Sequence, residues 1–394
     1  MASSLGTNKL PKLIEPIPSW VLCFIGIALV LVQPCKALPF RFTETHPLNT
    51  PRYSHTATLL DDGRVLVAGG VVSRGSSLAS AELYDPANST WTITGSLSDA
   101  RYDHTATLLT AGKVLVAGGY ADRNTILESA ELYDPATGTW TPTGSLNIPR
   151  TLHTATLLNG GKVLVTGGYD GLGRPSGTAE LYDPVSGRWT LTGQLITTRR
   201  SHTATLLSDG RVLVVGGFNL NSPVLASAEF YDPTTELWTT TGSLPTGRLD
   251  HTATLLRDGE VLVAGGINDS GYSITSVQLY DPSTGIWTAG GSLLKRRAAH
   301  TATLLTDGDV LVTGGYDAGE PRANSELYDP VSDTWSVADA LDIARAQHTA
   351  TRLLDGNVLV AGGTDGSNPV AIVEVTIRRP QSPKNEGGDG SHLH

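Results

Sequence analysis

The chain has 394 residues, of which 44 are glycine and only 17% are charged; this composition is typical of many short strands joined by tight turns. Its formal net charge is −10 at neutral pH. An acidic surface repels phosphate backbones, so the composition argues against nucleic-acid binding.

Residues 1–37 have the pattern of a secretory signal. Two lysines, Lys9 and Lys12, precede an apolar run over residues 20–32, which is short for a membrane-spanning helix but typical of a signal-peptide core. We therefore expect cleavage after Ala37 and a secreted or cell-surface protein. The alternative is that the run remains as an anchor, which would make the protein a single-pass membrane protein. Both cysteines of the chain lie in this segment, so we expect no disulfide or thiolate centre beyond it.

The sequence His-Thr-Ala-Thr recurs through the rest of the chain at a spacing of 49 residues, or 48 for the last copy. Each copy continues with Val-Leu-Val and a Gly-Gly pair, and all but the last with Tyr-Asp-Pro and a Trp. A period of this length with several short apolar segments predicts four-stranded antiparallel blades of a β-propeller. The histidines that begin the copies are His55, His104, His153, His202, His251, His300 and His348.

Within each repeat we predict four strands, A to D. In the first repeat, strand A is residues 55–60, strand B is residues 65–70, strand C is residues 81–85, and strand D surrounds Trp91. An Asp-Gly pair between strands A and B, such as Asp62-Gly63, is typical of a tight hairpin turn. No helical periodicity appears in the repeats, which argues against a helical solenoid.

The Gly-Gly pair, the Tyr and the Trp, with an Arg shortly before strand A, resemble the kelch repeat. The resemblance covers residues 41–378 and implies an all-β, seven-bladed propeller in which strand A lies nearest a central channel. We place this propeller in residues 38–378. Residues 379–394 are rich in Pro, Gly and charged residues, so we expect a disordered tail.

The seventh repeat lacks a strand D, and the beginning of the chain supplies a candidate. When residues are counted back from Arg52 as they are from Arg101, Phe42 falls at the position of Trp91. We therefore predict that residues 41–46 form the last strand of the seventh blade. This arrangement would close the ring and remove two exposed sheet edges.

The repeated charged residues are interpreted as structural. One His per blade is too dispersed for a metal site, which needs three or four converging ligands, so we predict no metal and no cofactor. An Arg precedes each His by three residues, and a Glu precedes the Tyr position by two, which predicts one buried ion pair per blade. The arginines are Arg52, Arg101, Arg150, Arg199, Arg248, Arg297 and Arg345, and the partners are Glu82, Glu131, Glu180, Glu229, Gln278, Glu326 and Glu374.

No catalytic constellation stands out in the sequence. Galactose oxidase and its copper-radical relatives, which share the kelch propeller, need a Cys crosslinked to a Tyr, and no Cys follows residue 37. We interpret the chain as a monomeric scaffold that binds a protein or carbohydrate ligand. The alternative is a carbohydrate-active enzyme similar to the sialic-acid mutarotases, although their catalytic residues could not be matched here.

Strand direction predicts which face of the propeller binds. The loops between strands B and C and the connections between blades share one face, and their sequences vary, whereas the opposite face carries only short turns. Asn88 and Asn268 begin Asn-X-Ser/Thr sequences and are candidate N-glycosylation sites. We predict that the binding residues at the channel mouth are Tyr53, Tyr102, Asp103, Arg200 and Asp250, with Tyr120, Asp170 and Asp317 around them.

Overall fold

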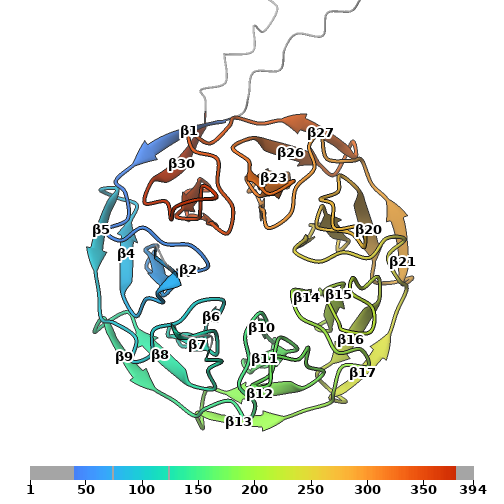
Figure 1. The fold of residues 1–394 in the computed structure, drawn as a ribbon, viewed down its shortest axis with the longest axis horizontal. Coiled ribbons are helices and arrows are strands. Elements are labelled where there is room, and N and C mark those ends of the chain that lie inside the picture. The colour runs from blue at the N-terminus through green and yellow to red at the C-terminus, as the bar shows by residue number, and fades with distance from the viewer. Residues whose placement is uncertain (1–39, 73–74, 123–124, 379–394) are drawn as a thin grey trace, which may run out of the picture. The chain divides into compact units, whose positions relative to one another are not determined.

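The computed structural model describes residues 40–72, 75–122 and 125–378. These residues form seven four-stranded antiparallel sheets arranged around a central channel (Figure 1), so the predicted seven-bladed propeller is confirmed. The expected signal segment, its cleavage position and the C-terminal tail lie outside the described residues. In the part of the chain that is described, no helix is long and apolar enough to cross a membrane.

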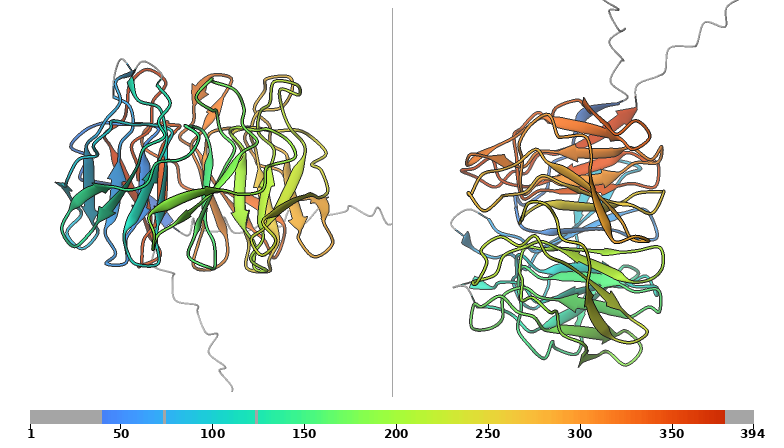
Figure 2. Two further views of the ribbon diagram at one scale, coloured as in Figure 1. Left: turned by 90° about the horizontal axis from the view of Figure 1, so that it is seen from below. Right: turned by 90° about the vertical axis from the view of Figure 1, so that its right-hand side faces the viewer.

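In the first six blades the strands follow chain order from the channel outwards, and seen edge-on they run between the two faces of the ring (Figure 2). A small hairpin, β24–β25, projects from the sixth blade. The strands are β1 (Phe40–Thr45), β2 (Thr56–Leu59), β3 (Val65–Ala68), β4 (Ala81–Asp85), β5 (Thr90–Ile93), β6 (Thr105–Leu108), β7 (Val114–Ala117), β8 (Ala130–Asp134), β9 (Thr139–Pro142), β10 (Thr154–Leu157), β11 (Val163–Thr166), β12 (Ala179–Asp183), β13 (Arg188–Leu191), β14 (Thr203–Leu206), β15 (Val212–Val215), β16 (Ala228–Asp232), β17 (Leu237–Thr240), β18 (Thr252–Leu255), β19 (Val261–Ala264), β20 (Val277–Asp281), β21 (Ile286–Ala289), β22 (Thr301–Leu304), β23 (Val310–Thr313), β24 (Tyr316–Asp317), β25 (Glu320–Pro321), β26 (Ser325–Asp329), β27 (Thr334–Val337), β28 (Thr349–Arg352), β29 (Val358–Ala361) and β30 (Val373–Arg378).

The second strand of every blade is buried at all of its positions because both of its faces meet a neighbouring sheet. In β3, Val65 and Val67 pack toward the seventh blade, whereas Leu66 and Ala68 pack toward the second. This explains why the Val-Leu-Val run is apolar throughout instead of alternating with polar residues. The core is therefore distributed between the blades and is not one central mass.

The repeated Tyr and Trp join neighbouring blades in the outer part of the ring. In the second blade the rings of Tyr133 and Trp140 lie 5.0 Å apart. The Tyr133 hydroxyl lies 2.7 Å from Thr94 Oγ1, and Trp140 Nε1 donates to the carbonyl of Gly95 at 2.8 Å. Both partners belong to the preceding blade, so each aromatic side chain adds a specific hydrogen bond to its apolar contact.

The N-terminal strand β1 completes the seventh blade, as its register predicted. It pairs antiparallel with β30, and Phe42 lies opposite Thr376, just as Trp91 lies opposite Tyr84 in the first blade. Phe42 is only 8% exposed. The strand spans residues 40–45, one residue earlier than predicted. The ring is thus closed by residues from both ends of the repeat array.

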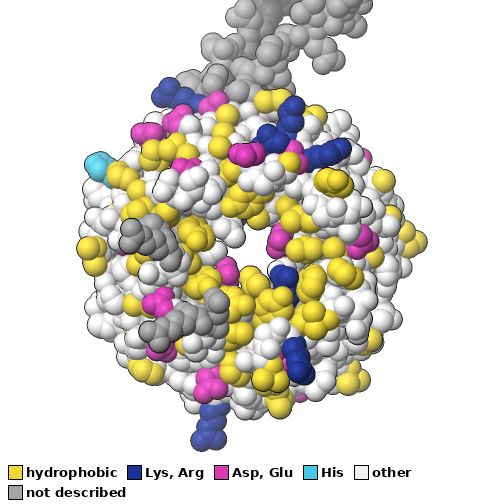
Figure 3. Space-filling view, in the orientation of Figure 1, with side chains coloured by type: hydrophobic (Ala, Val, Ile, Leu, Met, Phe, Trp, Pro, Cys, Tyr) yellow, Lys and Arg dark blue, Asp and Glu magenta, His cyan; other side chains and the backbone are white. Residues whose placement is uncertain are grey.

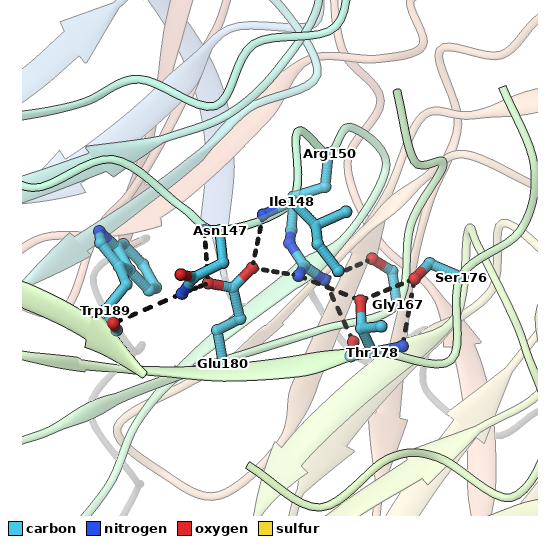
Figure 4. Close-up of polar contacts among 8 residues, drawn as sticks. All are labelled: Asn147, Ile148, Arg150, Gly167, Ser176, Thr178, Glu180 and Trp189. Atoms are coloured by element: carbon cyan, nitrogen blue, oxygen red, sulfur yellow. Dashed lines mark hydrogen bonds and ion pairs between the residues drawn. The ribbon is translucent and has the colours of Figure 1, made fainter. Parts of the chain in front are cut away.

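The predicted buried ion pairs are present in six blades, and Figure 4 shows the pair of the third blade. Arg150 Nη2 lies 2.5 Å from Glu180 Oε1, and both side chains are fully buried. The backbone N–H groups of Asn147 and Ile148 also donate to this carboxylate, at 2.8 and 3.2 Å. Arg150 in turn donates to the Gly167 carbonyl at 3.1 Å. Each charge is therefore compensated and hydrogen-bonded, which buried charges require.

The fifth blade departs from this network at two positions. Gln278 replaces the carboxylate, and Pro245, which has no N–H, replaces the donor that Asn147 supplies in the third blade. Arg248 is nevertheless fully buried, and its burial lowers the pKa of the guanidinium to about 10. The Gln278 Oε1 atom has no hydrogen-bond partner among the described residues. The fifth blade thus lacks both the carboxylate and one of the N–H groups that would donate to it.

Restoring both positions should stabilise the protein. The double variant Pro245→Asn with Gln278→Glu is expected to raise the free energy of unfolding by about 1–3 kcal/mol, because it supplies Arg248 with a countercharge and the carboxylate with a donor. Gln278→Glu alone should gain less, since Pro245 leaves one carboxylate oxygen without its donor. Denaturant unfolding of the two variants and the parent measures the difference. If the double variant were no more stable than the single one, the proposed coupling would be wrong.

Candidate functional site

One face of the ring carries the loops between the second and third strands of each blade together with the connections between blades. The two kinds of connection pair with each other in every blade through a short antiparallel bridge; in the second blade Tyr102 and Tyr120 exchange backbone hydrogen bonds of 2.9 and 2.8 Å. We name this the loop face and the opposite one the turn face. The bridging pairs are Tyr53–Val71, Tyr102–Tyr120, Thr151–Tyr169, Arg200–Phe218, Leu249–Ile267, Ala298–Tyr316 and Ala346–Thr364.

At the channel mouth, a closed circle of backbone hydrogen bonds links all seven blades. The residue before each repeated His donates its N–H to the carbonyl of the equivalent residue in the preceding blade; Ser54 closes the circle by donating to Gln347 at 3.2 Å. We name these residues the mouth ring. They are Ser54, Asp103, Leu152, Ser201, Asp250, Ala299 and Gln347.

Every residue of the mouth ring has a positive φ, between 49 and 53°. In this left-handed region a residue with a Cβ is disfavoured by roughly 1–2 kcal/mol, whereas glycine is not. Glycine is abundant in the chain, yet none of the seven positions has it. The molecule therefore keeps seven side chains at the channel mouth where glycine would relieve the strain.

Two carboxylates and one cation occupy this region. Burial and the nearby charge of Asp250 raise the pKa of Asp103 to about 6, against the opposing effect of a hydrogen bond from Ser54. Burial also raises the pKa of Asp250, which Arg200 and Ser201 oppose. Figure 3 shows acidic and basic side chains at the rim of the central opening. The structure thus brings Asp103, Asp250 and Arg200 near one another, and their part in binding stays a prediction.

Aromatic side chains continue from the mouth across the second to fourth blades. The rings of Tyr102 and Tyr120 lie 5.3 Å apart. The Arg200 guanidinium lies 4.6 Å from the ring centre of Tyr169 and 4.4 Å from that of Phe218, distances at which a cation is attracted to an aromatic face. We name these five residues the aromatic arc.

Tyr169 and Phe218 were not among the predicted binding residues. They occupy the position directly after the Gly-Gly pair, which is also the position of Tyr120. That shared register was visible in the sequence and could have identified them.

The other predicted residues divide between the mouth and the surrounding loops. Tyr53 lies near enough to Tyr102 and Tyr316 to contribute to the raised pKa of both phenols, for which burial is the larger cause. Asp170 instead accepts hydrogen bonds from backbone N–H groups of its own loop. Asp317 forms an ion pair with Arg322 at 2.5 Å. The carboxylates of Asp170 and Asp317 thus each have a partner within their own blades.

The two candidate glycosylation sites lie on different faces. Asn88 is exposed in the turn between β4 and β5, where its amide donates to Asp85 at 3.0 Å. Asn268 is half-buried in a loop of the fifth blade, and its side-chain oxygen accepts from the backbone of Ser270 and Tyr272. Glycosylation at either Asn stays a prediction.

The repeated histidines form the same contact in every blade. His104 Nε2 lies 3.0 Å from the hydroxyl of Thr56 in the preceding blade, and His55 makes the equivalent contact with Thr349 at 3.1 Å. Burial lowers the pKa of His104 to about 3, so its imidazole is neutral at neutral pH. Among residues 40–72, 75–122 and 125–378, no three potential metal ligands cluster. The histidines therefore join neighbouring blades, in keeping with the structural role predicted for them.

Comparisons with known proteins find the same kind of repeat and the same fold. A family model described as the KLHDC2/KLHL20/DRC7 Kelch-repeats domain matches residues 54–266, more than half of the chain. A second, the Kelch motif, matches residues 251–294 and 297–339. Curated protein sequences give no match. Among solved structures, a fungal alcohol oxidase of the AA5 family in complex with copper is similar with a TM-score of 0.71 and 17% identity, over 86% of this chain and 76% of that one. At this identity the likeness shows the fold alone.

Proposed function

The chain belongs to the family of kelch-repeat β-propellers, and from that premise we propose that it is a scaffold that binds a protein partner on its loop face. The observation that carries the proposal is the mouth ring, which keeps seven side chains in a strained backbone conformation. Strain that persists where glycine would remove it points to a use for the side chains. We expect the partner to contact the mouth ring and the aromatic arc together.

The chemistry of this surface supports a protein ligand. Tyr, Phe and Arg are enriched at protein interfaces because they bury large areas while keeping a polar or charged end. Arg200 is held between two rings, so it loses little conformational freedom when a partner binds. Asp103 and Asp250 would add charge that selects among partners. From the signal-like residues 1–37 we further propose that binding takes place outside the cytoplasm.

The proposal is tested by comparing variants on the two faces. Peptides are selected from a random peptide library on the parent protein, and their affinities are then measured for two double variants. Tyr102→Ala with Arg200→Ala should weaken binding by roughly tenfold or more, as truncated interface anchors do. Thr137→Ala with Ser186→Ala, both exposed on the turn face, should leave the affinities unchanged.

Melting curves of both double variants exclude unfolding as the cause. If the selected peptides kept their affinity for the loop-face variant and lost it for the turn-face variant, the binding face would be the opposite one.

A further inference from the structure

A second site lies on the loop face, between the fifth and sixth blades and separate from the aromatic arc. It is a pocket of about 540 Å³ whose lining combines three cations, Lys295, Arg296 and Arg322, with Asp317 and the neutral polar side chains of Thr275 and Asn324. Figure 3 shows basic side chains gathered on this face over the region where Figure 1 labels β26. Such a gathering is unexpected in a chain with a net charge of −10.

The two arginines are additions to the repeat. The N–H of Arg322 donates to the Gly315 carbonyl at 2.8 Å. The equivalent backbone bond in the other blades is made by an uncharged residue, which is apolar in five of them, as with Leu78, and is Ser176 in the third. Arg296 occupies the position of Ala100 and of other small or uncharged residues. The other blades form the same fold without a cation at either position, so the repeat itself requires neither arginine.

The cations are only partly compensated. Arg322 pairs with Asp317, but its Nε atom is buried without a hydrogen-bond partner among the described residues. Lys295 and Arg296 are exposed and form no ion pair within the described part of the chain. The pocket therefore has an excess of positive charge.

The remaining lining residues narrow the class of ligand. An anionic group matches the cations, and a carboxylate suits the planar donor fork of an arginine. Asp317 can accept hydrogen bonds from hydroxyl groups, and Thr275 and Asn324 can both accept and donate them. A polyacidic peptide would meet the charge of Asp317, and a neutral sugar would leave the cations unmatched. We propose that this pocket binds a sugar acid, in which one carboxylate accompanies several hydroxyl groups.

The test measures binding of glucuronate oligosaccharides to the full chain by calorimetry. Arg322→Leu and Arg296→Ala are expected to weaken binding by roughly tenfold or more each, since each removes a charge-assisted contact. Both variants install residues that other blades carry at these positions, so folding should be preserved. Arg174→Ala, which removes an exposed cation from a loop of the third blade, is the matched control and should bind like the parent.

A neutral ligand and a salt titration complete the design. Glucose oligosaccharides should bind much more weakly than glucuronate, and added salt should weaken glucuronate binding. The proposal is overturned if the parent does not bind glucuronate, if the Arg322 and Arg296 variants bind as the parent does, or if a poly-glutamate peptide binds more tightly through the same arginines. The last result would reassign the pocket to an acidic protein segment.

Discussion

Replacing Glu180 by Gln is expected to lower the free energy of unfolding by about 3–5 kcal/mol, because it leaves the buried Arg150 without a countercharge. Arg150 has no exposed surface, so water cannot solvate the charge when the carboxylate is gone. Two backbone donors would also lose part of a strong acceptor. Denaturant unfolding of the parent and the variant measures the change.

An exposed ion pair supplies the control. Asp62 and Arg64 lie 2.6 Å apart at the surface of the first blade, and Asp62→Asn should cost less than about 1 kcal/mol, since exposed pairs contribute little. Equal losses for Glu180→Gln and Asp62→Asn would mean that burial does not give the Arg–Glu pairs their importance.

Deleting residues 40–45 should be still more disruptive. It removes the outer strand of the seventh blade, exposes the edge of β30 and uncovers the cluster in which Phe40 and Phe42 pack against Leu311 and neighbouring residues of the sixth blade. The single substitution Phe42→Ala isolates part of this effect and should cost about 3 kcal/mol, as large-to-small substitutions in cores do.

Thermal unfolding of the deletion and of Phe42→Ala, compared with Arg41→Ala, tests this account of ring closure. Arg41 is exposed on the same strand, so its substitution should change stability by less than about 0.5 kcal/mol. A deletion variant that melts like the parent would show that β1 contributes nothing to the closed ring.

The blade number, the strand order and the closure of the ring were predictable because the sequence repeats in register. Six copies specify the same four strands and the seventh specifies three of them, so each strand assignment is tested at least six times. Phe42 was found by counting from Arg52, and the structure places it opposite Thr376 as that count required. The limits of β1 differed by one residue because the end of a strand depends on its partner as well as on its own sequence.

The candidate site was less predictable, since its residues meet only through the ring. The direction of the strands, read from the sequence, predicted the loop face. Tyr102, Asp103 and Arg200 lie in connections on that face. Strand direction did not predict that Arg200 would lie between Tyr169 and Phe218, which come from different blades. No local sequence pattern predicts the mouth ring either. Its hydrogen bonds join residues of separate repeats, and its left-handed backbone occurs without glycine.

Residues that differ from their equivalents in the other repeats carry information about the site that the regular positions do not. Pro245 lacks the backbone N–H that donates to the glutamate in the other blades, and Gln278 replaces that glutamate in the fifth blade. Arg296 and Arg322 are charged where the other blades have uncharged residues, and both line one pocket. Because residues in contact couple energetically, each of these two pairs of exceptions is best tested by substituting both members.

The circle of hydrogen bonds at the channel mouth is formed by backbone groups alone, so the side chains of the same residues can differ. It joins seven peptide groups, each bonded to the next, and none of those bonds uses a side chain. A substitution such as Leu152→Gln or Ala299→Asp would thus alter the side chain at the opening without removing any of these backbone hydrogen bonds. The same aperture can acquire a new specificity one residue at a time, and a library that varies these seven positions together should consist of folded proteins that differ chiefly in what they bind.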